Sequence, residues 1–278
     1  DCFNSRPNSS VLQEAIVIAS GGVYNYTSQQ KAVISRLNVT SITIKSIGLK
    51  SEFRGVGLDL CFDASVAHII DSIDAYPFKI CPNGIAKLED TFKIVNSVLR
   101  EVQIDLPFIK SFEVIDSEIT DKLSLAKFLT LEIIMENVNI TNFILSTPTG
   151  CSKLDLYGVI STNVAFRTDC DQSTIRLSSF TQSSLDLSRS ISVSIDESSF
   201  SNYMGGSDNP VLVLASAIPE NYTISIINSI FADNGVDFEE PVYSSYYSTI
   251  LFGNAFFDSA NNASIVISGC SFINNTAI

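Results

Sequence analysis

Residues 264–278 read SIVISGCSFINNTAI. Apolar residues alternate at Ile265 and Ile267, a turn of small residues follows at 268–270, and an aromatic residue and two asparagines come next. Alternation of this kind predicts a β-strand with one buried face. If the same pattern recurs along the chain at a fixed spacing, the fold is built from repeats.

The pattern does recur. Seven upstream stretches share a short strand of alternating apolar residues, a small or turn-forming residue and usually an apolar residue two positions later. Their turn positions, with that of the C-terminal copy, are Ser97, Ser117, Asn137, Gly158, Ser178, Ser198, Ser229 and Cys270. The spacing is about 20 residues over the first six copies and then lengthens to 31 and 41. Weaker copies have Ser46, Ser72 and Asn254 at the turn, and the last of these divides the final gap.

This period defines the fold class. About 20 residues with one strand per repeat is too short for a βαβ unit, and the repeats are too rich in β-branched residues to be helical. The leucine-rich pattern, which has a similar period, is absent. The repeat fits a coil whose strands stack in parallel on those of the next coil, about 4.8 Å apart. We therefore predict an all-β fold, a parallel β-helix solenoid of about 11 coils forming a single domain over residues 1–278.

The N-terminal segment predicts a capping helix over residues 10–20. Ser9 or Ser10 can cap it, its apolar residues fall largely on one face, and the glycines at 21–22 end it. Such a helix would cover an open strand edge, which otherwise invites aggregation. The helix, the double glycine and the following strand resemble the N-terminal segment of right-handed β-helix proteins of the pectin-lyase-like superfamily. The resemblance covers essentially the whole chain and implies a right-handed coil.

A narrower motif lies in the C-terminal copies. Phe231 with Asn234 and Phe272 with Asn275 form Phe-x-x-Asn repeats. They resemble the repeats of chlamydial polymorphic outer-membrane proteins and of related protist surface proteins. Phe200 and Phe256 lack the asparagine, and the companion Gly-Gly-Ala-Ile motif is missing. The resemblance implies a β-helix exposed on a surface.

Composition excludes several partners. Only 17% of residues are charged, the formal net charge is −13 and no basic cluster occurs. We therefore expect neither a nucleic acid nor an anionic membrane surface as a partner. No run of about 18 apolar residues occurs, so we expect no membrane insertion. The chain begins at Asp1, which fits either removal of a signal peptide or a fragment of a longer chain.

Glycosylation sequons and cysteines predict an extracellular or cell-surface location. Sequons begin at Asn8, Asn25, Asn38, Asn139, Asn221, Asn262 and Asn274, and N-linked glycans are the only non-protein groups we expect. We predict that the side chains of Asn139, Asn221 and Asn262 point outward. Cys61 and Cys81 are 20 residues apart and Cys151 and Cys170 are 19 apart, so each pair can occupy neighbouring coils and form a disulfide. The alternative is buried free thiols. Cys2 and Cys270 are expected to lie too far apart to join.

Two functional classes remain. The superfamily contains polysaccharide lyases and glycoside hydrolases, which need converging carboxylates or a calcium site with a basic residue. The single histidine, His68, fits a strand residue. Asp169 and Asp171, near Arg167, are weak candidates for a metal site, since two nearby acids in a chain with thirty are usually part of a solvated turn. Three or more acids within about 6 to 10 Å in an open groove would favour an enzyme, whereas a groove lined with Ser, Thr and Asn would favour a rod.

We therefore predict a non-catalytic extracellular or cell-surface glycoprotein with a structural, fibre-forming or adhesive role. The alternative is a carbohydrate-active β-helix enzyme with an atypical acidic site. Long insertions between the last copies suggest a contact surface for glycans or surface proteins, with Tyr243, Tyr246 and Tyr247 either in that surface or filling a loop base. We expect the last coil to be covered, either by further coils of a longer chain or by another copy in a head-to-tail assembly.

Overall fold

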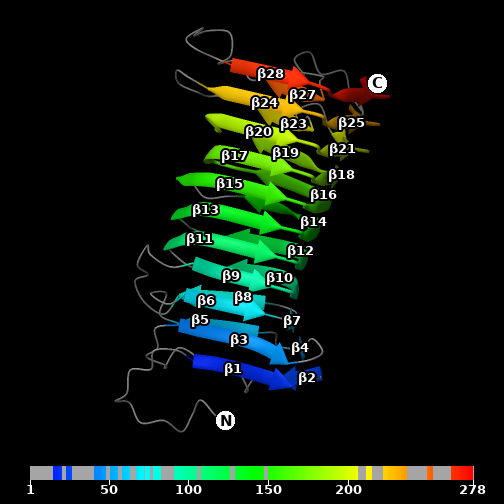
Figure 1. Ribbon diagram of the computed structural model, residues 1–278. Helices are drawn as coiled ribbons and strands as arrows, with labels where there is room; N and C mark the ends of the chain where they lie inside the picture. The colour runs from blue at the N-terminus through cyan, green and yellow to red at the C-terminus, as the bar shows by residue number, and fades with distance from the viewer. Residues whose placement is uncertain are drawn as a thin grey trace. The chain divides into compact units, whose positions relative to one another are not determined.

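The computed structural model divides the chain into two compact units, residues Asp1–Val138 and Asn139–Ile278. It describes residues 15–20, 23–26, 41–47, 51–55, 58–62, 67–71, 73–75, 78–82, 91–104, 108–125, 129–146, 150–205, 211–214, 222–236, 249–252 and 264–277. All regular structure in this part of the chain is β-strand, and Figure 1 shows the strands of each unit stacked as parallel arrows.

The first unit contains two runs of parallel strands. One run has the order β1 (Ala15–Ser20), β3 (Ser41–Ile47), β6 (Ala67–Asp71), β9 (Thr91–Val95), β11 (Phe108–Ile115) and β13 (Leu129–Glu136). The other has the order β2 (Val23–Tyr26), β4 (Ser51–Gly55), β7 (Ile73–Ala75), β10 (Val98–Ile104) and β12 (Glu118–Leu125), and β8 (Phe78–Pro82) joins β10 to β5 (Leu58–Phe62). Apart from β5 and β8, which follow β4 and β7 in the same sheet, successive strands alternate between the two runs, so neighbours within a run are separated by one repeat of the sequence.

The second unit repeats this arrangement. One run is β15 (Cys151–Tyr157), β17 (Cys170–Arg176), β20 (Ser192–Asp196), β24 (Thr223–Ile227) and β28 (Ser264–Ser268). The other is β14 (Asn139–Ser146), β16 (Ile160–Arg167), β18 (Ser179–Thr181), β21 (Ser199–Ser201), β25 (Ile230–Ala232) and β29 (Ser271–Ile273), with β19 (Ser184–Leu187), β23 (Leu212–Leu214) and β27 (Ile250–Phe252) beside it. A small third sheet joins β22 (Met204–Gly205), β26 (Gly235–Val236) and β30 (Thr276–Ala277). Stacked parallel sheets are compatible with the predicted β-helix; its coil number stays a prediction.

Two sequence predictions are corrected by the strand order. Residues 15–20 form strand β1, whereas the predicted helix covered 10–20. The β-branched run Ile16, Val17 and Ile18 favours a strand, and this preference outweighs the helical spacing of the apolar residues. The copy with Asn254 at its turn does not divide the last gap, because β28 pairs directly with β24. The nearby strand β27 instead pairs with β23, so the insertion extends the neighbouring sheet.

Apolar side chains of one repeat stack on those of the next to form the core. In the second unit, the register aligns Leu156, Ile175, Ile195 and Ile226, all fully buried. In the first unit, Ile94, Val114 and Met135 align in the same way and are also fully buried. Burying a side chain of this size stabilises the fold by about 1.5–3 kcal/mol relative to leaving it exposed. The alternation seen in the sequence is therefore the alternation between this core and solvent.

A left-handed residue turns the chain from one sheet to the other in each repeat. It is Asn96, Asp116 or Asn137 in the first unit, and Gly158, Leu177, Glu197, Asn228 or Gly269 in the second, with φ between 47° and 64°. Asparagine, aspartate and glycine tolerate this conformation best. Leu177 and Glu197 occupy it without that advantage. Asn137 and Gly158 thus correspond to Asn96 and Asp116, the left-handed residues that precede Ser97 and Ser117. The sequence spacing had aligned them with the serines themselves, one position later in the repeat.

A ladder of buried serines follows these turns. The Ser178 N–H donates to Oγ of Ser198 (3.2 Å), and the Ser198 N–H donates to Oγ of Ser229 (3.3 Å). Each hydroxyl in turn donates to the carbonyl oxygen of the residue two positions earlier in the sequence, as Ser198 does to Asp196 (2.9 Å). Ser97 and Ser117 make the same contacts in the first unit. Buried backbone groups at the corner are therefore paired. Cys270 occupies the equivalent position beside Ser229.

The Phe-x-x-Asn motif forms two further ladders in the second unit. The rings of Phe180, Phe200, Phe231 and Phe272 stack, with centroids 4.9 to 5.0 Å apart and planes within 7° of parallel. Asn234 lies between neighbouring repeats: its Nδ2 donates to the carbonyl oxygen of Phe200 (2.9 Å), and its Oδ1 accepts the N–H of Tyr203 (3.1 Å). The amide side chain supplies both the donor and the acceptor that this position uses, on two separate atoms.

Candidate functional site

The acidic pair identified in the sequence lies on the solvent side of the second unit. Asp169 precedes β17 and Asp171 is within it, and they flank the fully buried Cys170. Asp169 forms an ion pair with Arg189, whose Nη1 lies 2.9 Å from Oδ2, and Arg167 is exposed. Within the described residues, no three His, Cys, Asp or Glu side chains come together as a metal site would need. A metal site at the two aspartates thus stays a prediction, and Asp169 is paired with the Arg189 guanidinium.

The predicted disulfide between Cys151 and Cys170 is confirmed. The two residues are register partners on β15 and β17, their Cα atoms are 4.3 Å apart, and both side chains are buried. Closing the 19-residue separation removes entropy from the unfolded chain, which in the chain-entropy model stabilises the fold by roughly 3 kcal/mol. The bond therefore joins neighbouring repeats inside the core, at the place where the repeat spacing put it.

The second predicted disulfide has the matching register. Cys61 and Cys81 are Cα partners on β5 and β8, but their side chains lie outside the described part of the structure, so the bond stays a prediction. His68 is confirmed as a strand residue: it lies in β6, in register with Ile42 and Phe92. Cys270 is the only free cysteine among the described residues, and Cys2 lies outside them.

Two sequon asparagines have described side chains. Asn139 is the first residue of β14 and is exposed, as expected for a glycan attachment site. Asn274 is also exposed, with φ at 49°, and its Nδ2 donates to Oδ1 of Asp233 (3.2 Å). Asn25 lies in β2. The remaining sequon asparagines, and the tyrosines proposed as a contact surface, lie outside the described residues: Asn8, Asn38, Asn221, Asn262, Tyr243, Tyr246 and Tyr247.

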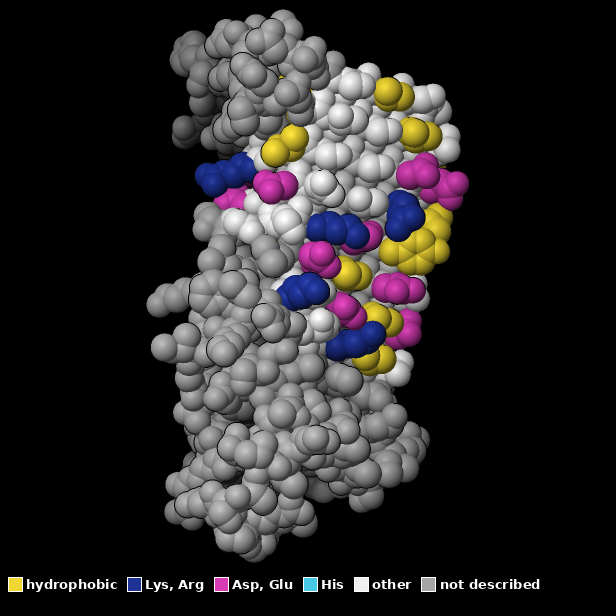
Figure 2. All heavy atoms as spheres, turned by 60° about the vertical axis from the view of Figure 1, so that its left-hand side comes forward, with side chains coloured by type: hydrophobic (Ala, Val, Ile, Leu, Met, Phe, Trp, Pro, Cys, Tyr) yellow, Lys and Arg dark blue, Asp and Glu magenta, His cyan; other side chains and the backbone are white. Residues whose placement is uncertain are grey.

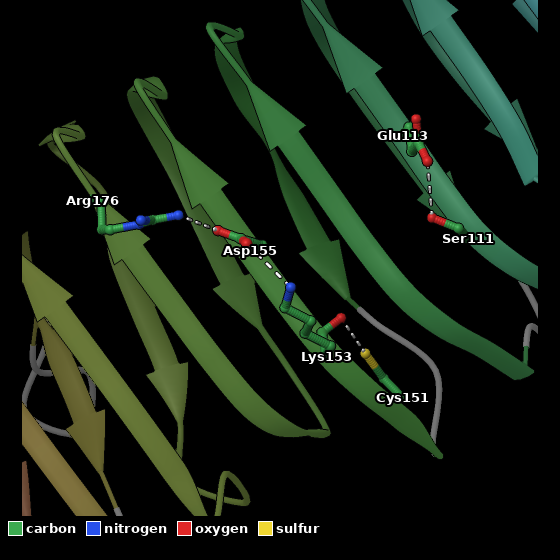
Figure 3. A network of polar contacts seen from close by, with 6 residues as sticks. All are labelled: Ser111, Glu113, Cys151, Lys153, Asp155 and Arg176. Carbon is green, nitrogen blue, oxygen red and sulfur yellow. Dashed lines mark hydrogen bonds and ion pairs between the residues drawn. The ribbon is translucent and has the colours of Figure 1, made fainter.

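An ion-pair network on β15 and β17 was not predicted from the sequence. Nζ of Lys153 lies 3.3 Å from Oδ2 of Asp155, and Nη2 of Arg176 lies 3.8 Å from Oδ1 of the same carboxylate (Figure 3). The guanidinium also lies over the ring of Tyr157, 5.6 Å from its centroid. Sγ of Cys151 contacts the Lys153 carbonyl oxygen at 3.3 Å, without a proton to donate because it is in the disulfide. The Asp155 carboxylate thereby has two cationic neighbours, although its buried Oδ1 accepts no hydrogen bond.

The first unit has a smaller pair of the same kind. Glu113 lies 3.3 Å from Nζ of Lys93 and accepts a weak hydrogen bond of 3.4 Å from Oγ of Ser111. Figure 2 shows basic and acidic side chains interspersed over the described surface. Exposed pairs contribute only about 0–1 kcal/mol each. The pairs Lys93–Glu113 and Asp155–Arg176 could not be predicted from the sequence, because their partners are 20 and 21 residues apart and become neighbours only through the strand register.

Comparisons with known proteins add no family. No family model, curated protein or solved structure matches this chain. Within the described residues, no helix has the length and apolar character needed to span a membrane.

Proposed function

We propose that this protein is a non-catalytic extracellular or cell-surface glycoprotein with a structural, fibre-forming or adhesive role. In this proposal the stacked sheets are parts of a right-handed parallel β-helix of the pectin-lyase-like kind. The observation that carries it is the buried disulfide between Cys151 and Cys170. Structural disulfides form and persist in oxidising compartments and are rare in the cytosol. The exposed sequon residue Asn139 is the second support, since glycans are added in the same secretory compartments.

The ladders support a structural rather than a catalytic role. Serine hydroxyls accept hydrogen bonds from the backbone of the neighbouring repeat, phenylalanine rings stack on one another, and asparagine amides bond between repeats, so rigidity is distributed along the stack. Hydroxyl side chains predominate on the outward face of β20 and β24, where Ser192, Ser194, Thr223 and Ser225 stand beside Asp196 and Ile227. Such a surface favours display or contact with polar polymers over the converging carboxylates that polysaccharide cleavage requires.

Association through β28 and β29 belongs to the same proposal. Phe272 stacks on Phe231 with one ring face, yet 53% of its surface is exposed, and Val266, Ile267 and Ile273 are exposed to a similar extent. A further coil with the same repeat would continue the ring ladder. We propose such a coil as the cover, and a second copy in head-to-tail contact is the competing outcome. Mass measurement of the native protein, in solution and after denaturation, distinguishes the two.

The decisive experiment combines peptide mapping with an activity assay on protein secreted from eukaryotic cells. We expect a Cys151–Cys170 linked peptide without reduction, a glycan on Asn139, and no new reducing ends or unsaturated products after incubation with acidic and neutral polysaccharides with added calcium. Thiols at Cys151 and Cys170 would remove the main support. Cleavage of a polysaccharide that is lost in a D169N/D171N variant would establish the enzyme alternative.

A further inference from the structure

Three apolar side chains are exposed at one corner of the second unit. Tyr157, Ile160 and Leu177 are 37%, 55% and 50% exposed. Tyr157 and Ile160 flank the turn between β15 and β16, and Leu177 occupies the equivalent turn position of the next repeat, beside Gly158, whose N–H donates to the Arg176 carbonyl oxygen (3.0 Å). We call these three residues the apolar corner. Single exposed apolar residues are common, but grouped ones usually have a partner.

Asn139 lies directly beside this corner. In the register of β14 and β16, Asn139 is the Cα partner of Ile160, and Thr141 is the partner of Thr162. Neighbouring strands are about 4.8 Å apart, so the Asn139 amide and the Ile160 side chain are adjacent. Ile140, between the two polar sequon positions, is fully buried, which leaves Asn139 on the solvent side. A group attached to Nδ2 of Asn139 therefore starts next to the apolar corner.

We propose that an N-linked glycan on Asn139 packs its first N-acetylglucosamine residues over the apolar corner. This inference rests on the proposed function, because the glycan requires passage through a secretory compartment. The sugar suits the surface: its ring presents C–H groups and its acetamide a methyl group, which pack on aliphatic and aromatic side chains, while its hydroxyl groups remain in water. The attachment point fixes the sugar beside Ile160, so the contact is intramolecular and needs only modest affinity.

The test compares glycan removal in two backgrounds. The glycan is removed whole from the folded, secreted protein with a peptide-N-glycosidase, which hydrolyses the bond to Nδ2 and leaves aspartate at position 139. Its attachment is prevented separately by N139Q and by T141A, which leaves the asparagine in place. Each is done in the natural protein and in an I160T/L177G variant, in which threonine retains strand propensity and glycine suits the left-handed turn. Binding of a fluorescent dye specific for exposed apolar surface is measured together with the thermal midpoint. N274Q, which removes another exposed sequon in the same unit, is the control.

We expect glycan loss to raise dye binding about twofold in the natural protein and to leave it unchanged in the I160T/L177G variant, which is the signature of coupled sites. The N274Q change should have the same effect in both backgrounds. Equal effects of Asn139 glycan loss in both backgrounds would overturn the packing proposal while leaving a glycoprotein. If Asn139 carries no glycan in the secreted protein, the packing proposal is overturned, and Asn139 no longer supports the proposed function. Self-association of the glycosylated protein that is abolished by I160T/L177G would identify a second copy as the occupant instead. Enzymatic removal from folded protein keeps the test valid if a variant fails to fold.

Discussion

Asn234 and Asn275 occupy equivalent positions on neighbouring repeats, and the backbone N–H and the Nδ2 of Asn234 both donate to Oδ1 of Asn275, at 3.2 and 3.0 Å. Nδ2 of Asn275 continues the chain of contacts by donating to the carbonyl oxygen of Phe231 (2.8 Å). Asn234 is 2% exposed. The amide ladder is therefore a buried, fully directional network, in which each side chain must supply a donor on one side and an acceptor on the other.

The first prediction is that N234D destabilises the second unit strongly. Aspartate cannot donate to Phe200 or to Asn275, and its carboxylate would face two acceptor oxygens in a buried site. We expect a loss of roughly 2–4 kcal/mol in the free energy of unfolding, measured by denaturant titration. N202D makes the same chemical change at an exposed residue with φ at 55° and should stay within about 0.5 kcal/mol of the natural protein. Similar losses for the two variants would show that the ladder contacts are not responsible.

The second prediction concerns the serine ladder. S198A removes the acceptor of the Ser178 N–H, and no water can replace it at a position that is 2% exposed. We expect a loss of about 1–3 kcal/mol, because a buried donor is left unpaired. S194A, on the outward face of the preceding strand β20, should change stability by less than about 0.5 kcal/mol. If hydrogen exchange of the Ser178 amide is equally slow in S198A and the natural protein, the ladder bond is not what protects it.

The repeat spacing predicted the strands and the Cys151–Cys170 bond, because a disulfide needs only neighbouring positions on successive coils. It did not predict the Asn234 network, whose partners are Phe200 and Asn275, 34 and 41 residues away across insertions. Because the insertions differ in length, a search for a fixed period cannot tell which residues of neighbouring repeats are register partners. The apolar spacing near the N-terminus predicted a helix over residues 10–20, but the β-branched run in residues 15–20 forms a strand that pairs in parallel with β3. Periodicity thus fixed the stacking, whereas side-chain contacts depended on register.

The third prediction tests the disulfide energetically. The double variant C151A/C170A should lose about 3 kcal/mol of unfolding free energy, because its unfolded chain is no longer cross-linked. Reductant should lower the unfolding free energy of the natural protein. It should lower that of the double variant by about 3 kcal/mol less, and this difference isolates the Cys151–Cys170 bond from any other cysteines. C270A, which changes the free cysteine, serves as the control and should keep the full response to reductant. An unchanged response in C151A/C170A would mean that this bond contributes no stability.

The last prediction concerns alkaline pH. Tyr222 is 6% exposed, and burial raises the pKa of its phenol above the usual value of about 10, because the low-dielectric interior disfavours the phenolate. Below pH about 10 the phenol is neutral in both the folded and the unfolded chain, so its contribution to stability is fully present. As pH rises from there toward the folded-state pKa, the unfolded chain releases the proton first, and the free energy of unfolding falls. We expect Y222F to show a shallower decline in this window, measured by denaturant titration at several pH values. A Y222F slope equal to that of the natural protein would assign the alkaline sensitivity to other groups.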